Sequence, residues 1–317
     1  MVCGGKEIPM KKWIGYVSFA LLFLVGLSLL LYPLVSDRWN QRRNDALIKN
    51  YTEQIMQAPK NDYAQWFDRA DSYNAVLPGK GVPDAFTFIT DEEDADYFSQ
   101  LAFSDDGVMG YIRIPRISVN LPIYHGTSQK VLERGVGHLQ GSALPVGGAD
   151  THCVLSAHRG LPSAALFTDL DLLRVGDHFY IYVLDRVLAY EVDQVLEVEP
   201  DHTEDLDVLP GEDLVTLVTC TPYGVNTHRL LVRGHRVAYT EDVEQHESQN
   251  VVSSVHTQYT LWVVLGLSIT LVFVLLMLWL SRRKPRGGKR LMKGKPDGNR
   301  RHQPQRLRGK ESQQDEA

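Results

Sequence analysis

The sequence contains few cysteines, and this limits the chemistry it can support. Its 317 residues include three, Cys3, Cys153 and Cys220. Neither Cys153 nor Cys220 has a second cysteine or a histidine at the spacing typical of zinc sites, so we expect no metal site. A disulfide between these two residues stays open from the sequence alone.

Charged residues are absent from two long apolar runs, residues 13–35 and 259–280. The runs are 23 and 22 residues long, and a helix needs about 20 apolar residues to cross the hydrocarbon core of a membrane. Neither run has the polar face of an amphipathic core helix. Tryptophan, which favours the headgroup region, flanks both runs at positions 13, 39, 262 and 279. We therefore predict two transmembrane helices.

A cleaved signal peptide is the alternative for the first run. Residues 32–36, Tyr-Pro-Leu-Val-Ser, lack the small-x-small pattern of a cleavage site. The sequence therefore favours an uncleaved signal anchor over residues 13–35.

Positive charge is scarce between the two runs. Residues 36–258 carry 17 Lys and Arg against 34 Asp and Glu, although the whole chain has a net charge of only −6. Residues 1–12 have a net charge of +2 and residues 281–317 one of +9. This pattern makes nucleic acid an unsuitable partner for the acidic centre, and it favours membrane lipid as a partner of the basic tail.

The basic ends also predict the orientation in the membrane. Four basic residues within 282–286 follow the second run directly, and the positive-inside rule places them in the cytoplasm. Two crossings return the N-terminus to the same side, so we expect a cell-membrane protein with both termini cytoplasmic and its centre extracellular. Arg38, Arg42 and Arg43, on the outer side of the first run, oppose this orientation.

Changes in composition divide the chain into seven segments. These are an N-terminus (1–12), a first span (13–35), a helical region ending in a loop (36–107), a β-rich domain (108–240), a polar juxtamembrane linker (241–258), a second span (259–280) and a basic disordered tail (281–317).

Apolar residues alternate with period two from Val108 onward, which is typical of half-buried strands. Candidate strands cover 111–115, 117–121, 153–156, 179–184, 187–198, 214–220 and 229–237, and a hairpin turn is expected at Asp185-Arg186. Short helices are expected at Ser128–Arg134 and Ser163–Leu173. The pattern predicts a mostly-β domain that closes into a barrel.

Three strand ends carry residues suited to nucleophilic catalysis. Cys220 ends an apolar strand, His158 ends another, and Arg229 begins the strand after a loop that leads back to Cys220. A cysteine nucleophile needs a nearby proton acceptor or cation, and a fixed arginine can stabilise a tetrahedral oxyanion. Arg159 and Arg233 are expected to form structural ion pairs, and histidines 125, 138, 152 and 228 to be packing or surface residues.

Several ordered motifs resemble those of sortases, and within that family the pilin-polymerising class C enzymes of Gram-positive bacteria. The main ones are TLVTCTPY at 216–223 and NTHRLLVRG at 226–234, supported by GYI at 110–112, LPIYHGT at 121–127 and HRGLP at 158–162. The resemblance covers residues 108–237 densely. It implies a sortase-type closed β-barrel with short helices, preceded by a helical region with a lid.

The resemblance also implies a transpeptidase that needs no cofactor. Cys220 would attack the Thr–Gly bond of an LPXTG-type sorting signal and form a thioester, His158 would transfer protons, and Arg229 would hold the substrate and the oxyanion. In class C the acceptor is a lysine of another pilin subunit, so pilins would be the partners. A cell-wall-anchoring sortase with a peptidoglycan-precursor acceptor, a hydrolytic cysteine protease and a non-enzymatic receptor are the alternatives.

The sequence departs from the class C pattern at the lid. The family carries an Asp-Pro-aromatic motif there, and the nearest match is Asp84-Ala85-Phe86. Without the proline ring the backbone is less restrained. The hypothesis is that Phe86 shields Cys220 while Asp84 binds the basic site; an ordinary loop with one buried aromatic is the alternative. Thr219 is a weaker candidate for orienting the substrate.

Overall fold

The computed structural model describes residues 10–59, 63–77, 82–86, 94–249, 251–252 and 255–282. The predicted basic tail from residue 283 onward and Cys3 lie outside these ranges. The chain forms two compact units, residues 1–266 and 267–317. The helices are α1 (Met10–Gln57), α2 (Tyr63–Asn74), α3 (Ala95–Ser99), α4 (Gln129–Leu132), α5 (Glu241–Gln249) and α6 (Val255–Arg282), with short 3-10 turns at Pro115–Ile117, Leu170–Leu172 and Glu204–Leu206.

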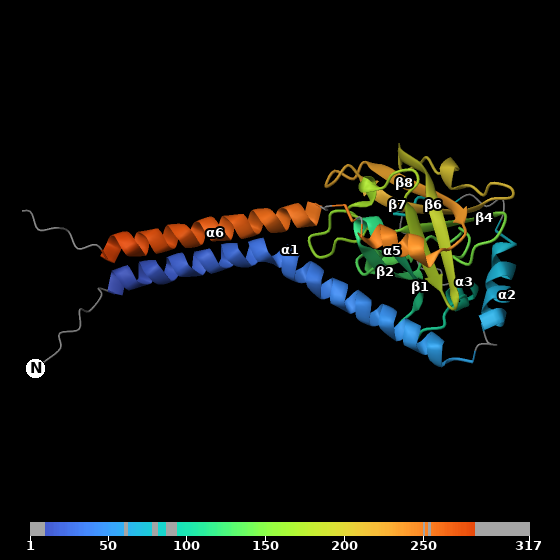
Figure 1. Ribbon diagram of the computed structural model, residues 1–317, viewed down its shortest axis with the longest axis horizontal. Helices are drawn as coiled ribbons and strands as arrows, with labels where there is room; N and C mark the ends of the chain where they lie inside the picture. The colour runs from blue at the N-terminus through green and yellow to red at the C-terminus, as the bar shows by residue number, and fades with distance from the viewer. Residues whose placement is uncertain are drawn as a thin grey trace, which may run out of the picture. The chain divides into compact units, whose positions relative to one another are not determined.

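Eight strands close into a barrel, as the sequence predicted (Figure 1). The strands are β1 (Val108–Ile114), β2 (Val119–His125), β3 (Val136–His138), β4 (Thr151–Ser156), β5 (His178–Val183), β6 (Arg186–Val198), β7 (Asp213–Thr221) and β8 (His228–Val237). Their order around the barrel is β1-β2-β3-β4-β7-β8-β6-β5. Two neighbouring pairs, β2–β3 and β4–β7, are parallel and the others antiparallel.

The barrel interior is filled by large aliphatic and aromatic side chains. Ile112, Ile123, Ile181, Leu217 and Val232 are fully buried in one apolar cluster. They come from β1, β2, β5, β7 and β8, so the core is shared around the barrel rather than contributed by one hairpin. The hairpin turn between β5 and β6 occupies Leu184-Asp185, one residue earlier than expected.

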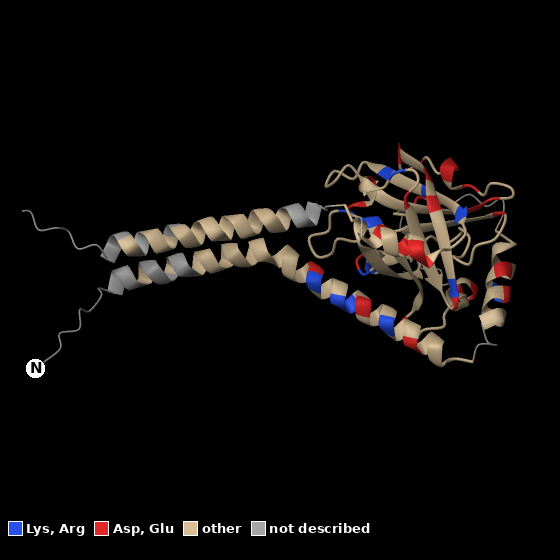
Figure 2. Ribbon diagram, in the orientation of Figure 1, with Lys and Arg blue, Asp and Glu red and all other residues tan. Residues whose placement is uncertain are grey.

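Helix α1 contains the first apolar run and then continues along the barrel. It is bent (Figure 1) and includes Pro33, whose missing N–H and bulky ring favour bending within a helix. Among the described side chains of α1, charges begin only at Asp37, beyond the apolar segment (Figure 2). Both α1 and α6 have stretches long and apolar enough to cross a membrane.

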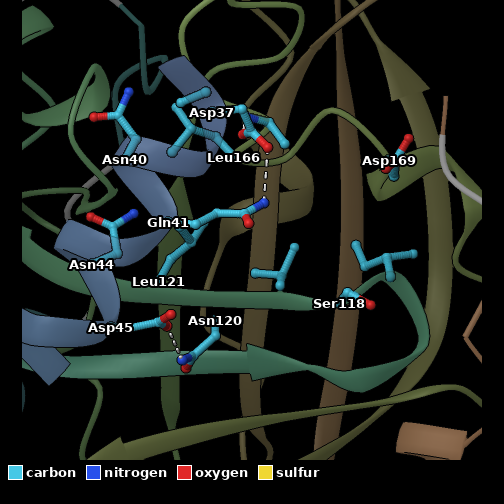
Figure 3. A pocket seen from close by; sticks show the side chains of 14 residues that line it. Asp37, Asn40, Gln41, Asn44, Asp45, Ser118, Asn120, Leu121, Leu166 and Asp169 are labelled. Carbon is cyan, nitrogen blue, oxygen red and sulfur yellow. Dashed lines mark hydrogen bonds between the residues drawn. The ribbon is translucent and has the colours of Figure 1, made fainter. Parts of the chain in front are cut away.

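Polar contacts attach α1 to the loop that follows β4. Asp37 accepts a hydrogen bond from the Ala165 backbone N–H at 2.8 Å, and the Asn40 side chain donates to the Ser163 carbonyl at 2.8 Å. Asp37, Asn40 and Ala165 border a cavity of about 290 Å³ (Figure 3), where Asp45 also accepts a hydrogen bond from Asn120 at 3.1 Å. The predicted helix at Ser163–Leu173 is wrong, since only Leu170–Leu172 form a 3-10 turn. The Ser163 carbonyl and the Ala165 N–H bond to side chains of α1 instead of to a helix of their own.

A second attachment of α1 depends on one tyrosine hydroxyl. Tyr51, 1% exposed, donates to the Met109 carbonyl at 3.0 Å and accepts from the Leu184 backbone N–H at 2.8 Å. The hydroxyl therefore joins α1 to β1 and to the β5–β6 turn. Tyr124 lies in the same small apolar cluster, but within the described chain its hydroxyl makes no hydrogen bond.

We expect Tyr51→Phe to lower the free energy of unfolding by about 1–3 kcal/mol, because it leaves a buried N–H and a buried carbonyl without their partner. The matched variant Tyr124→Phe removes an unpaired hydroxyl and should change stability by less than about 0.5 kcal/mol. Chemical denaturation of both variants measures this difference. Equal losses would contradict the assigned role of the Tyr51 hydroxyl.

Candidate active site

The pairing of three strands brings the predicted catalytic residues to one end of the barrel. Cys220 on β7 and Arg229 on β8 are directly opposite each other in an antiparallel pair. Strand β4 runs parallel to β7, with Ser156 opposite Val218, so His158 leaves β4 at the same edge at which Cys220 leaves β7. Because β4 and β7 are parallel, their C-terminal ends lie at the same edge of the barrel. Three residues that are up to 71 positions apart in the sequence therefore meet there.

The segment 82–86 lies across this edge. The Asp84 carboxylate accepts two hydrogen bonds from the Arg229 guanidinium, from Nε and from Nη2, both at 2.8 Å. Both side chains are only 12% exposed. A bidentate pair of this kind fixes geometry as well as adding energy. Asp84 therefore occupies the anion-binding fork of Arg229.

Phe86 packs against His158 and Arg229. Its ring centroid lies 5.8 Å from that of His158, and the guanidinium carbon of Arg229 lies 5.0 Å from the ring centroid. The second distance is within the range of cation–π attraction. Phe86 thus contacts two of the predicted catalytic residues at once.

Ala85 stands where the class C pattern has proline, and it is buried. Its side chain is 1% exposed, and together with Val82 it belongs to a small apolar cluster at the barrel edge. The other buried members are Leu139, Val154, Leu206, Val218 and Leu231. Packing therefore restrains the segment at the position where the proline ring is missing.

The surroundings shift the pKa values of the cysteine and the histidine in opposite directions. Burial raises the pKa of Cys220 above its ordinary value of 9.0; Arg229 opposes this rise and Asp84 adds to it. Burial lowers the pKa of His158 below 6.5, against the opposing effect of Glu133. With segment 82–86 in place, both pKa shifts favour the neutral forms, a thiol on Cys220 and an imidazole on His158.

Arg159 holds the backbone around the site. Its guanidinium pairs with Asp171 at 2.5 Å and donates to the Thr168 carbonyl at 3.1 Å and to the Thr221 hydroxyl at 3.3 Å. Because Arg159 follows His158 and Thr221 follows Cys220, these bonds connect the two strand ends. The expected structural pairs of Arg159 and Arg233 are confirmed, the latter with Asp193 at 3.0 Å.

Thr219 lies beneath the site rather than on its surface. The side chain is fully buried, and its hydroxyl donates to the Ala157 carbonyl at 2.8 Å. This bond ties β7 to the residue before His158. An effect of Thr219 on substrate would be exerted through this backbone, and its contact with substrate stays a prediction.

Cys153 and His138 lie away from this edge, whereas His228 begins β8 next to Arg229 and opposite Thr221. Cys153 and Cys220 are both free, since Cys153 is opposite Val215, five residues before Cys220 on the neighbouring strand. His138 is fully buried, with a pKa lowered to about 4 by burial, and bonds to the Tyr97 hydroxyl at 2.8 Å. Within the described ranges, no three His, Cys, Asp or Glu side chains are grouped to hold a metal ion.

Sequence reasoning did not find two neighbours of the site. Glu133, just after α4, acts electrostatically on His158 although it lies 25 residues before it. The exposed ring of Tyr223 lies over Arg159, 6.0 Å from its guanidinium carbon. A methyl group on Gly160 would lie 3.2 Å from the Tyr223 ring, so glycine allows this close approach. Neither contact has a signal in the linear sequence.

Comparison with known proteins agrees with this geometry. The family described as the sortase domain matches residues 112–237. Sortase C1 from Streptococcus agalactiae has a solved structure with 51% sequence identity and a TM-score of 0.57, covering 62% of this chain and 100% of that one. Sortase C from Streptococcus pneumoniae has 44% identity and a TM-score of 0.56, covering 62% of this chain and 98% of that one.

A more distant similarity connects the chain to another sortase. Sortase A of Streptococcus agalactiae serotype III is 33% identical over 117 residues, which are 36% of this chain and 47% of that protein. The alignment thus spans about half the length of that relative. Together with the closed barrel and the full coverage of the class C structures, these similarities show that the chain belongs to the sortase family of cysteine transpeptidases, in class C.

Proposed function

We propose that the protein cleaves an LPXTG-type sorting signal and transfers the acyl fragment to a lysine amine of a pilin subunit, so that pilins polymerise. The observation that carries this proposal is the direct opposition of Cys220 and Arg229 across two strands, with His158 at the same edge. Nucleophile, proton shuttle and cationic donor are the three functions that acyl transfer requires.

In the first half-reaction, His158 takes the proton of the Cys220 thiol, and the thiolate attacks the carbonyl carbon of the threonine in the Thr–Gly bond. The Arg229 guanidinium donates hydrogen bonds to the oxyanion that forms. His158 then protonates the glycine amine, the C–N bond breaks, and a thioester remains on Cys220. The raised pKa of Cys220 and the lowered pKa of His158 both favour the neutral pair from which this first proton transfer starts.

In the second half-reaction, a lysine amine attacks the thioester carbonyl. His158 accepts the proton that the amine releases, and the C–S bond breaks. The proton then passes from His158 to the Cys220 sulfur, which restores the thiol. An isopeptide bond forms between two subunits. No oxidant, reductant or external energy source is needed, because the thioester retains the free energy of the cleaved peptide bond.

The segment 82–86 acts in this proposal as a lid. Asp84 holds the guanidinium that the substrate needs, and Phe86 lies against His158. Substrate binding then requires that the lid leave the site. The alternative of an ordinary loop with one buried aromatic is disfavoured by the bidentate ion pair with Arg229.

Two apolar helices support anchoring in the cell membrane. In this proposal the spans are residues 13–35 and 259–280, both termini are cytoplasmic, and the barrel within 108–240 is extracellular. The lid lies in the helical region 36–107, the linker at 241–258 leads to the second span, and the tail at 281–317 contacts anionic lipid. This arrangement places the barrel on the side where surface proteins are assembled.

The choice of acceptor rests on the class C neighbours. The structure of the Streptococcus pneumoniae enzyme is described as giving insight into pilin substrate specificity. A cell-wall-anchoring sortase would use a peptidoglycan precursor, and a cysteine protease would use water. The class C likeness and the lid favour a pilin lysine over both.

The direct test incubates the purified full-length chain, in detergent, with a pilin that carries an LPXTG-type signal. We expect a ladder of covalent pilin oligomers on a denaturing gel. Cys220→Ala should lower the rate by at least about 10³-fold, because no other side chain can replace the nucleophile. The matched variant Cys153→Ala removes a buried thiol remote from the site and should keep the ladder. Cleavage without a ladder would reject the polymerase, and no cleavage even in a lid variant would reject the enzyme.

The lid can be tested separately by thiol labelling. We expect Phe86→Ala to speed alkylation of Cys220 by about tenfold. Without the ring, segment 82–86 loses its aromatic contact with His158 and its cation–π contact with Arg229, and it should uncover the thiol more often. Mass spectrometry of the peptide that contains Cys220 measures the rate. Phe103→Ala is the control, because it also removes an aromatic ring, but one that packs on Tyr63 and Trp66 of α2 instead of on the site. An unchanged rate in Phe86→Ala would argue against the lid.

The pH dependence of the same labelling tests the charge arrangement. Because the pKa of Cys220 is raised above 9.0, the wild-type rate should still be climbing at pH 9 rather than reaching a plateau. Asp84→Asn removes a negative charge that favours the thiol, so the rise should move to lower pH and labelling at pH 7 should be faster. An unshifted profile in Asp84→Asn would contradict the assigned effect of that carboxylate.

A further inference from the structure

Three arginines lie just beyond the first apolar run, where the proposed topology puts the outer membrane surface. Arg38, Arg42 and Arg43 are all exposed on α1. Positive charge normally accumulates on the cytoplasmic side of a membrane protein. These residues therefore need an explanation that the proposed transpeptidase activity does not give.

Arg38 and Arg42 line a common groove. Their spacing of four residues puts them on one face of the helix. The groove has a volume of about 720 Å³, and apolar residues from the ends of both predicted spans line it, together with the loop between α5 and α6. These are Leu34, Val35, Val251, Val252 and Leu261. Arg43 is not among the lining residues, so the groove selects two of the three arginines.

Among the described residues neither Arg38 nor Arg42 forms an ion pair, whereas Arg113 pairs with Glu244 at 2.7 Å and Arg116 with Asp177 at 3.0 Å. The acidic residue that also lines the groove, Asp37, already accepts hydrogen bonds from the Ala165 N–H and from Gln41. Two guanidinium groups thus remain available to an anion.

Trp39 marks the level at which that anion would lie. It lines the same groove and is 71% exposed. An indole with this exposure, next to an apolar run, is typical of the interface between hydrocarbon and headgroups. Along α1 the apolar wall is followed by Arg38, Trp39 and Arg42, so an acyl chain on the wall would have its headgroup beside both arginines and the indole.

We propose that this groove binds one anionic phospholipid of the outer leaflet, with its phosphate on Arg38 and Arg42 and an acyl chain against the apolar wall. The inference rests on the proposed topology but not on the catalytic activity. Guanidinium groups recognise phosphate by paired hydrogen bonds. A zwitterionic headgroup also carries a cation, which the arginines repel, so an anionic headgroup should bind more tightly. The lipid would bind next to Asp37 and Asn40, the residues that hold the loop 163–165 after His158.

The test uses the full-length chain in detergent micelles, so that its outcome does not depend on orientation in a membrane or on turnover. Equal amounts of phosphatidylglycerol and phosphatidylcholine are added, and native mass spectrometry counts the lipids retained. We expect a preference for phosphatidylglycerol, and about a 25-fold loss of that preference in R38Q/R42Q, taking about fivefold per basic residue at an anionic lipid surface.

Arg43→Gln is the matched control, because it removes the same charge from the same helix outside the groove. It should keep the preference, and thermal unfolding without lipid should show that all variants are folded. An unchanged preference in R38Q/R42Q, or an equal loss in Arg43→Gln, would overturn the proposal. Displacement of the lipid by glycerol 3-phosphate at equal concentration would overturn it as well, because the acyl chain would then contribute nothing.

Discussion

The position of β7 between β4 and β8 is the constraint on which the site depends. Its antiparallel pairing with β8 puts Arg229 opposite Cys220, and its parallel pairing with β4 ends the His158 strand at the same edge. Strand β7 is buried on both faces, with Val215 and Leu217 in the main apolar cluster and Val218 in the cluster around Ala85, so a slip of one residue would exchange the side chains of its two faces. Hydrogen bonds from Thr219 to Ala157 and from Arg159 to Thr221 hold the strand ends in that register.

The ion pair of Asp84 with Arg229 then connects the site to the rest of the chain. A guanidinium that is bound twice by a carboxylate is unavailable to an oxyanion, and the same carboxylate helps to keep Cys220 protonated. Catalytic competence in our proposal is therefore a competition between the lid and the substrate for Arg229. Ala85 makes the lid depend on packing against the barrel rather than on a stiff backbone.

The sequence predicted those parts of the molecule that follow from local pattern. Alternating apolar residues predicted the long strands, and ordered motifs singled out Cys220, His158 and Arg229, which the fold brings to one edge of the barrel. Strand β3 was missed because it has only three residues and includes Gly137. The helix predicted near residue 165 was wrong because α1, more than 120 residues earlier, takes up the backbone hydrogen bonds. The influence of Glu133 on His158 likewise arises only in the folded chain.

The most direct measurement of the central claim is to trap the covalent intermediate. An LPXTG-type peptide is incubated with the Phe86→Ala chain without an acceptor amine, quenched in acid and analysed by mass spectrometry. The account predicts that the fragment ending in threonine is attached to the peptide containing Cys220 through a bond that hydroxylamine cleaves. Cleavage of the peptide with no adduct on Cys220, or with an adduct on another residue, would contradict it.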